Sequence, residues 1–82
     1  MMEAFVLIKV VQSESNPDLD FMKSVERRIA EIKGVKEVNE VFGRWDFVVR
    51  VQTKTLLELG NLVADCIRSI NGVLTTETLI IG

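Results

Sequence analysis

The sequence predicts an α+β fold in which one βαβ half is followed by a second half of similar length. Ile32-Lys33-Gly34-Val35 and Ile70-Asn71-Gly72-Val73 each place a glycine and a β-branched residue after an amphipathic stretch, and each leads into an extended segment. Because the chain has only 82 residues, two such halves fit one small domain with the element order βαββαβ. We therefore expect residues 1–82 to form a single ferredoxin-like domain, in which a four-stranded antiparallel sheet carries two helices on one face.

The first strand is expected over residues 4–11, which are almost entirely Val, Ile, Leu and Phe. Such a run is typical of a central strand that is covered on both faces. The first helix follows a polar segment, residues 12–18, in which Asn16 can cap the helix and Pro17 suits its first position. The apolar residues of this helix recur at helical spacing and predict its buried stripe: Phe21, Met22, Val25, Ile29 and Ile32.

The second strand, residues 35–42, alternates in polarity and is expected to be more exposed than the first. Gly43 and Arg44 predict a tight two-residue hairpin turn, because short hairpins need the positive φ that glycine tolerates. The third strand then covers residues 45–52.

The second helix is predicted to begin at Thr55, which forms a capping-box pattern with Glu58. Cys66 lies beside its apolar stripe and is interpreted as a core thiol, because the chain has no histidine that could activate it. The last strand is expected over residues 73–81. The predicted buried stripe of the helix consists of Leu56, Leu59, Val63, Ile67 and Ile70.

Apolar residues occupy both faces of the predicted sheet. The first strand is apolar at both parities, and in the last strand Leu79 and Ile81 lie on the face opposite to Ile80. An exposed apolar face of this extent would favour aggregation of a monomer. We therefore expect a homodimer in which the sheets of two copies pack together.

Arg50 is a charged residue among the valines of the third strand. A guanidinium there needs a carboxylate, and Glu77 and Glu40 on other strands are the candidates, within the chain or across a dimer. An ion pair that fixes strand pairing is the simpler interpretation, and a ligand-binding role is the alternative.

The composition excludes several functions. Ten basic residues are dispersed among twelve acidic ones and the net charge is −2, which argues against autonomous binding of nucleic acid. The chain has no histidine, no tyrosine and no Cys-x-x-Cys pair, so we expect neither an enzyme nor a metal or other cofactor. No segment approaches the ~20 apolar residues of a membrane span, and the interpretation is a soluble cytoplasmic protein.

Two groups of residues remain as a candidate ligand site. Gly43, Arg44, Trp45 and Asp46 lie at the hairpin, where glycine exposes backbone donors and aspartate can accept from an ammonium group. Thr76 and Thr78 would point to the same side of the last strand. These groups suit an amino-acid-like ligand, although turns favour glycine and aspartate and strands favour threonine for structural reasons alone.

The order of these motifs resembles the effector-binding (RAM) domain of the Lrp/AsnC family of transcription regulators. The hairpin residues 43–46 are followed by an apolar strand, a helix ending in Asn71-Gly72-Val73, and Thr76-Glu77-Thr78. The resemblance covers residues 4–81. Family members carry a helix-turn-helix domain ahead of this module, whereas the present sequence begins directly at the first strand, so it resembles a stand-alone version.

The resemblance implies how such modules assemble and where they bind their ligands. Such modules dimerise through their sheets, the dimers associate into rings that are commonly octameric, and amino acids bind at the boundary between dimers. By position, Gly43 and Asp46 would contribute backbone and carboxylate contacts, and Thr76 and Thr78 would lie toward the ligand. Trp45 occupies the family's aromatic position and suits a core or interface role equally well, while Arg44 could pair with a ligand carboxylate. Full-length Lrp/AsnC regulators are further expected partners, and direct contact with nucleic acid or membrane is not expected.

Three other functions are alternatives to amino-acid sensing. The chain could be an ACT-like regulatory module, although its first loop is charged instead of glycine-rich. A pure assembly domain without a working pocket is the second alternative. The third, a dimeric ferredoxin-like enzyme, is poorly supported because the chain lacks histidine and tyrosine.

Overall fold

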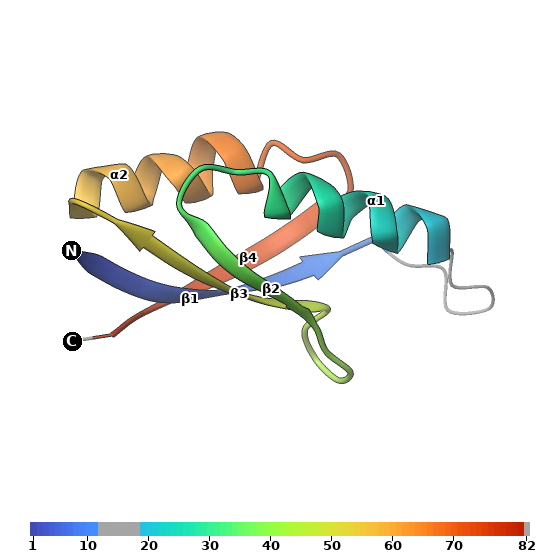
Figure 1. Ribbon diagram of the computed structural model, residues 1–82. Helices are drawn as coiled ribbons and strands as arrows, with labels where there is room; N and C mark the ends of the chain where they lie inside the picture. Colours follow the sequence, from blue (N-terminus) through green and yellow to red (C-terminus); the bar gives the residue numbers. More distant parts are fainter. Residues whose placement is uncertain (12–18, 82) are drawn as a thin grey trace.

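The computed structural model describes residues 1–11 and 19–81. Its element order is the predicted βαββαβ, with the second helix extended by a π-helical segment, η1 (Figure 1). Asn16, Pro17 and the rest of the predicted cap of the first helix lie outside the described residues. No helix in the described ranges is both long and apolar enough to cross a membrane. The elements are β1 (Met2–Val10), α1 (Leu19–Ala30), β2 (Val35–Glu40), β3 (Phe47–Thr53), α2 (Leu56–Asn61), η1 (Leu62–Ile67) and β4 (Val73–Ile81).

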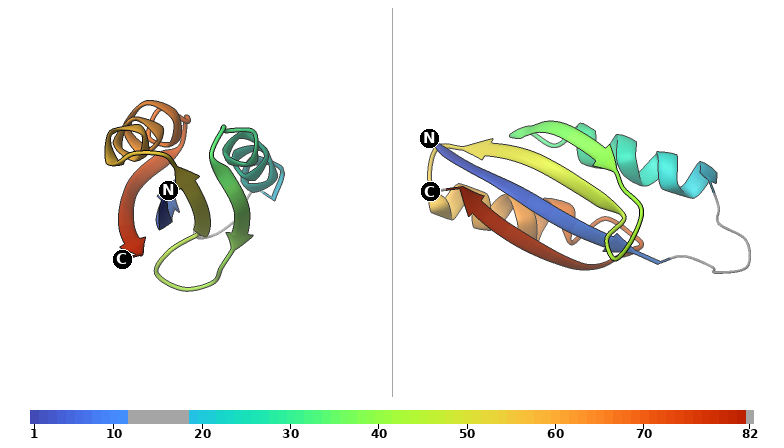
Figure 2. Two further views of the ribbon diagram at one scale, coloured as in Figure 1. Left: turned by 60° about the vertical axis from the view of Figure 1, so that its left-hand side comes forward. Right: turned by 90° about the horizontal axis from the view of Figure 1, so that it is seen from below.

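The four strands form one antiparallel sheet in the order β2-β3-β1-β4. Both helices cover the same face of this sheet and leave the other face open (Figure 2). The predicted central place of β1 is confirmed, since it pairs with β3 on one side and with β4 on the other. The predicted exposure of β2 is also confirmed, because β2 is an edge strand that pairs only with β3.

The hydrophobic core lies between the sheet and the helices. Every second residue of β1 and β3 is buried there, as period-2 alternation requires. The predicted stripe of α1 is confirmed: Met22, Val25 and Ile29 are buried, and Phe21 and Ile32 pack partly buried against them. The remaining core residues are Ala4, Val6, Ile8 and Val10 of β1, Phe47, Val49 and Val51 of β3, and Leu59, Leu62, Ile67 and Ile70 of the second helical region.

The two repeated sequence motifs form the same helix-to-strand turn twice. Gly34 and Gly72 have φ angles of +100° and +104°, and in each turn the following valine N–H donates to the isoleucine carbonyl at 3.1 Å. Each glycine carbonyl then accepts from the neighbouring segment at 2.8 Å, Gly34 from Gln52 and Gly72 from Val11. A side chain at Gly72 would collide with the ring of Phe21. Both the backbone angle and the packing therefore require glycine there.

The second helix begins as predicted. Thr55 Oγ1 accepts from Glu58 N–H at 3.1 Å, and the Glu58 carboxylate accepts from Lys54 N–H at 3.0 Å. These bonds satisfy two backbone donors that the helix start would otherwise leave without a partner. In a standard capping box the Glu58 carboxylate would accept from the backbone N–H of the cap residue, Thr55. Here it accepts from Lys54, the residue before the cap.

The predicted buried stripe of this helix was partly wrong. Leu56 is exposed, whereas Leu62, which was not predicted, is buried. The burial of Leu62 together with Ile67 reflects the π-helical turn, in which Arg68 N–H donates to the carbonyl of Val63 five residues earlier at 2.9 Å. The wider turn places Leu62 and Ile67, rather than residues four apart, on the buried side. It also turns Cys66 outward, so the interpretation of Cys66 as a core thiol was wrong: its thiol is exposed.

Candidate ligand site and open sheet face

The connection between β2 and β3 is held against β1 by the backbone and side chain of Asp46. Asp46 N–H donates to the Ile8 carbonyl at 2.9 Å, and the Val10 N–H donates to Asp46 Oδ2 at 2.8 Å. Val41 N–H closes the loop by donating to the Asp46 carbonyl at 2.9 Å. The prediction of a two-residue turn at Gly43-Arg44 was therefore wrong. The connection spans residues 41–46, because Asp46 pairs with β1 before β3 begins at Phe47.

Asp46 is the most buried acidic residue of this region, with 5% of its surface exposed. Its Oδ2 atom lies 3.8 Å from Lys9 Nζ, and the Lys9 side chain is 40% exposed. An ion pair that is open to water on one side contributes little, so the hydrogen bond to Val10 N–H is the stronger contact. The carboxylate thus fixes the loop to the end of β1.

Four of the six candidate residues lie on the connection between β2 and β3, and the other two lie on β4. Gly43, with a φ of +129°, and Arg44 are exposed, and Trp45 is partly buried. Thr76 and Thr78 are partly buried on β4 and pair with Ile8 and Val6. Their side chains share the helix-covered face, which confirms that they point the same way. Thr76 and Asp46 are separated by the end of β1, because Ile8 contacts both segments.

A hollow of about 540 Å³, here called the loop hollow, adjoins this loop. Gly43 and Asp46 line it, whereas Arg44, Trp45, Thr76 and Thr78 do not. Its remaining lining residues are Lys9, Val10, Leu19, Met22, Glu40, Val41, Phe42 and Leu74.

Sequence reasoning missed eight of the residues around the loop hollow: Lys9, Val10, Leu19, Met22, Glu40, Val41, Phe42 and Leu74. Phe42 was expected within the second strand, but it lies on the loop with 99% of its surface exposed. An isolated exposed aromatic next to a glycine turn was the signal that could have shown it. Lys9 and Glu40 gave no such signal, since charged residues are common near strand ends.

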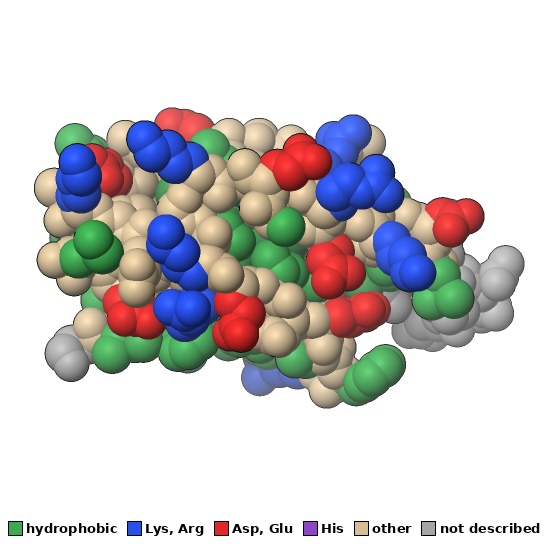
Figure 3. Space-filling model, in the orientation of Figure 1, with side chains coloured by type: hydrophobic (Ala, Val, Ile, Leu, Met, Phe, Trp, Pro, Cys, Tyr) green, Lys and Arg blue, Asp and Glu red, His purple; other side chains and the backbone are tan. Residues whose placement is uncertain are grey.

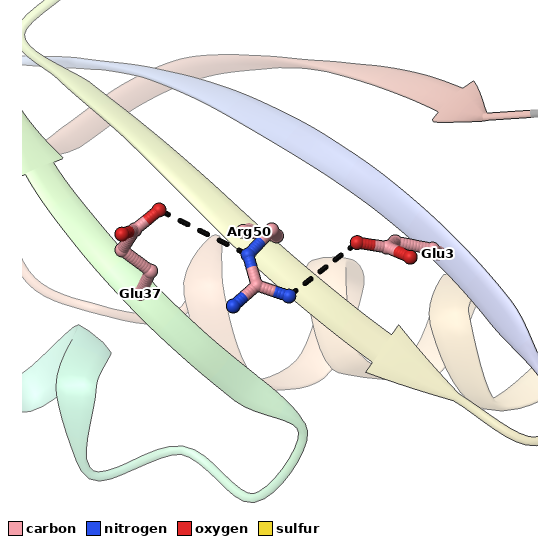
Figure 4. A network of polar contacts seen from close by, with 3 residues as sticks. All are labelled: Glu3, Glu37 and Arg50. Carbon is pink, nitrogen blue, oxygen red and sulfur yellow. Dashed lines mark hydrogen bonds and ion pairs between the residues drawn. The ribbon is translucent and has the colours of Figure 1, made fainter.

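The open face of the sheet carries a charged group beside an apolar stripe. Arg50 on β3 lies between Glu3 of β1 and Glu37 of β2, with N···O distances of 3.4 and 3.9 Å (Figure 4). The need for a carboxylate partner is confirmed, but the two predicted partners were wrong. Glu40 pairs with Phe47 and so faces the helices, and Glu77 lies two strands away on β4.

The apolar stripe runs across β3, β1 and β4. Strand register places Phe5 opposite Leu79, and Leu7 opposite Val48, on the face without helices. Ile81 joins them, and in the single chain Leu79 and Ile81 are each 49% exposed. On the side of the molecule seen in Figure 3, acidic and basic side chains are interspersed, and hydrophobic side chains appear along part of its lower border.

The described residues offer no group of three or more His, Cys, Asp or Glu side chains that could hold a metal ion. The residues that line the loop hollow offer hydrogen-bonding groups, charged groups and apolar surface.

Comparison with known proteins identifies the family. Residues 3–81 match the model of the Lrp/AsnC ligand-binding domain. An uncharacterised helix-turn-helix-type transcriptional regulator of Pyrococcus horikoshii is 37% identical over 78 residues, which are 94% of this chain and 49% of that protein. The chain thus spans about half the length of the curated regulators it matches. A segment of the homocitrate synthase of Sulfolobus acidocaldarius is 43% identical over 61 residues, which are 74% of this chain and 13% of that enzyme.

Two solved structures share the fold of this chain over nearly all of its length. A protein of Thermus thermophilus superimposes with a TM-score of 0.84 at 35% identity and covers 100% of this chain and 94% of its own. A transcriptional regulator of Neisseria meningitidis, solved as a complex with L-methionine, has a TM-score of 0.83 at 14% identity and covers 99% of this chain and 49% of its own. The match over residues 3–81 and the shared fold lead to one conclusion: this chain belongs to the Lrp/AsnC ligand-binding domain family.

Proposed function

We propose that this chain senses an amino acid at the loop hollow and converts binding into a change of assembly between copies that pack through their open sheet faces. It would regulate transcription indirectly, by associating with itself or with full-length regulators of its family, without contacting DNA through its own surface. The match to a ligand-binding domain over residues 3–81 is the observation that carries the proposal.

The loop hollow has the chemistry that a zwitterion requires. Lys9 can pair with a ligand carboxylate, and Glu40, which has no ion-pair partner among the described residues, can accept from an ammonium group. Gly43 has no side chain and leaves the loop backbone accessible. Met22 and Leu74 supply apolar surface for a ligand side chain.

The candidate residues divide by role in this proposal. Asp46 holds the loop through Val10 N–H and borders the loop hollow, so it is proposed as a positioning group as well as a contact. Arg44, Trp45, Thr76 and Thr78 do not line the loop hollow of a single chain. We propose that they reach the ligand from a neighbouring copy, which fits a site completed by assembly.

Two relatives support a sensing role. The Neisseria regulator, which shares the fold, was solved with L-methionine, and amino acids are therefore the first ligands to test. The similarity to a segment of an enzyme, homocitrate synthase, indicates that this kind of module is not confined to DNA-binding proteins. Response to a small molecule is the role that a regulator and an enzyme can share.

Assembly through the open face would bury the apolar stripe. Phe5, Leu7, Val48, Leu79 and Ile81 together form a surface that water does not favour. A second copy offers the same surface about a two-fold axis, as symmetric dimers require. A ligand would change the assembly only as far as it binds one state better than another.

Titration calorimetry over the common amino acids tests the proposal. We expect one or a few amino acids to bind the wild type, and Lys9→Gln and Glu40→Gln to weaken that binding by about tenfold each, since each removes one charge pair. Arg28→Gln, an exposed change near the other end of α1 that lines neither the loop hollow nor any other groove described here, is the matched control. Absence of heat with every amino acid, or equal affinity in all variants, would refute the proposed site.

A further inference from the structure

A second groove lies at the opposite end of the sheet and shares no lining residue with the loop hollow. It has a volume of about 520 Å³, within the usual range for small-molecule sites, and is here called the η1 groove. It lies between the α1–β2 turn, the end of β3, the start of α2 and η1. Its lining consists of Met1, Ile32, Lys33, Gly34, Lys36, Gln52, Thr53, Lys54, Glu58, Asn61, Leu62, Asp65 and Cys66.

The irregular backbone features of this end of the fold all border the η1 groove. Gly34 stands at a φ of +100°, and a Cβ atom there would lie 2.9 Å from Leu62 Cδ1. The register of β2 against β3 shifts between Val35 and Glu37, which leaves Lys36 at a β-bulge. Bulges re-aim side chains, and Lys36 is consequently part of the groove wall.

The helical wall of the η1 groove also contains an irregular backbone segment. The π-helical turn of η1 places Asp65 and Cys66 in the wall, and π-turns of this kind are frequent at functional sites. Thr53 Oγ1 donates to the Thr55 carbonyl at 2.9 Å and fixes the path from β3 into α2.

The rim of the η1 groove is positively charged. Lys33, Lys36 and Lys54 line it, and none of them has an ion-pair partner within the described parts of the chain. Of the two acids in the lining, Glu58 already accepts from Lys54 N–H at 3.0 Å. Three ammonium groups thus face two carboxylates, Glu58 and Asp65, so the lining has an excess of one positive charge.

We propose that the η1 groove binds a small organic anion, a carboxylate with a short branched apolar chain, separately from the effector at the loop hollow. The lysines supply charge for the carboxylate, and the amides of Gln52 and Asn61 supply further hydrogen-bonding groups. Ile32 and Leu62 provide apolar contact for the chain. The excess of positive charge selects an acid over its neutral amide.

Cys66 makes the electrostatic part of the proposal measurable, because it is the only cysteine of the chain and lies exposed in the groove wall. The rate of its alkylation by iodoacetate, an anion, is divided by the rate with neutral iodoacetamide. We expect this ratio to fall about fivefold when Lys36→Gln and Lys54→Gln are combined, and to fall in the wild type as salt rises. Lys23→Gln is the control and should leave the ratio unchanged. A ratio that is the same in all three proteins would overturn the proposal.

Protection of Cys66 from alkylation tests whether the η1 groove binds an organic acid. The probe 4-methylpentanoate should slow alkylation of wild-type Cys66 by iodoacetamide, and its uncharged counterpart 4-methylpentanamide should not. If the double lysine variant does not fold, amide chemical shifts of the wild type replace it: the acid should move signals of Gly34, Gln52 and Leu62 but not those of residues 41–46. Equal protection by the amide, or shifts confined to the loop hollow, would show that no such site exists. Amino-acid binding at the loop hollow is measured independently and does not depend on this outcome.

Discussion

Replacement of Asp46 by alanine probes the contact that fixes the candidate ligand loop. In the native chain the Asp46 carboxylate accepts from the buried Val10 N–H at 2.8 Å. Asp46→Ala removes this acceptor and leaves a backbone donor without its partner at a residue that is only 1% exposed. Asp46→Asn is the matched variant, because its amide oxygen can still accept.

The expected loss follows from these contacts. A buried backbone donor without an acceptor costs ~1–3 kcal/mol, and a charged acceptor places this bond in the upper half of that range. The Lys9 contact, at 3.8 Å with a side chain that is 40% exposed, adds at most ~0.5 kcal/mol because water screens it. We therefore expect Asp46→Ala to lower the free energy of unfolding by ~2–3 kcal/mol and Asp46→Asn by ~1 kcal/mol.

Urea denaturation of the three proteins at one protein concentration measures these differences, since assembly makes stability concentration-dependent. For a domain of this size a loss of ~2 kcal/mol corresponds to a fall in melting temperature of about 8–16 °C. Hydrogen exchange of the Val10 amide should accelerate in the alanine variant and stay slow in the asparagine variant. A loss below ~0.5 kcal/mol for Asp46→Ala, or equal losses for both variants, would refute the reasoning.

Three further substitutions test the contributions of two glycines and one helix cap to stability. Gly72→Ala should cost ~2–3 kcal/mol, because its φ of +104° is strained for alanine and its Cβ would meet the ring of Phe21. Gly60→Ala should instead stabilise by ~0.5–1 kcal/mol, since a Cβ on that α2 residue meets nothing within 4 Å; thermal unfolding that ranks these two variants the other way would contradict both assignments. Thr55→Ala should cost ~1 kcal/mol through the lost cap at Glu58 N–H, and unchanged unfolding in urea would show that the cap contributes nothing.

Local sequence patterns were sufficient to predict most of the fold. The two Gly-Val turns, the central place of β1, the alternation in β3 and the stripe of α1 each depend on residues close in sequence, and all were confirmed. The bounds of β4, Val73–Ile81, match the prediction. Such features are encoded by backbone angles and by the periods of strand and helix, which a single sequence displays directly.

Features that depend on distant contacts were not predictable in the same way. The β2–β3 loop is longer than a tight turn because Asp46 bonds to Val10, which lies 36 residues earlier in the chain. The partners of Arg50 depend on the register of three strands. At the candidate site, Gly43 and Asp46 line the loop hollow together with Lys9, which reaches it only through the pairing of β1 with its neighbours.

The π-helical turn is another feature that the sequence did not predict. Leu62 and Ile67 are both buried although they are five residues apart, a spacing that helical periodicity does not anticipate. The same turn exposed Cys66 and formed one wall of the η1 groove. A single local departure from the α-helix therefore accounts for the errors at Leu62 and Cys66 and contributes one wall of the η1 groove.

The central claim is that the open sheet face is covered by a second copy, and sedimentation velocity at micromolar concentration tests it most directly. The wild type should sediment as a dimer or larger assembly. Leu79→Glu, at a half-exposed position on that face, should sediment as a folded monomer, while Leu57→Glu, at a 74% exposed position on α2, should remain assembled. A monomeric wild type, or an assembly that Leu79→Glu leaves intact, would contradict the claim.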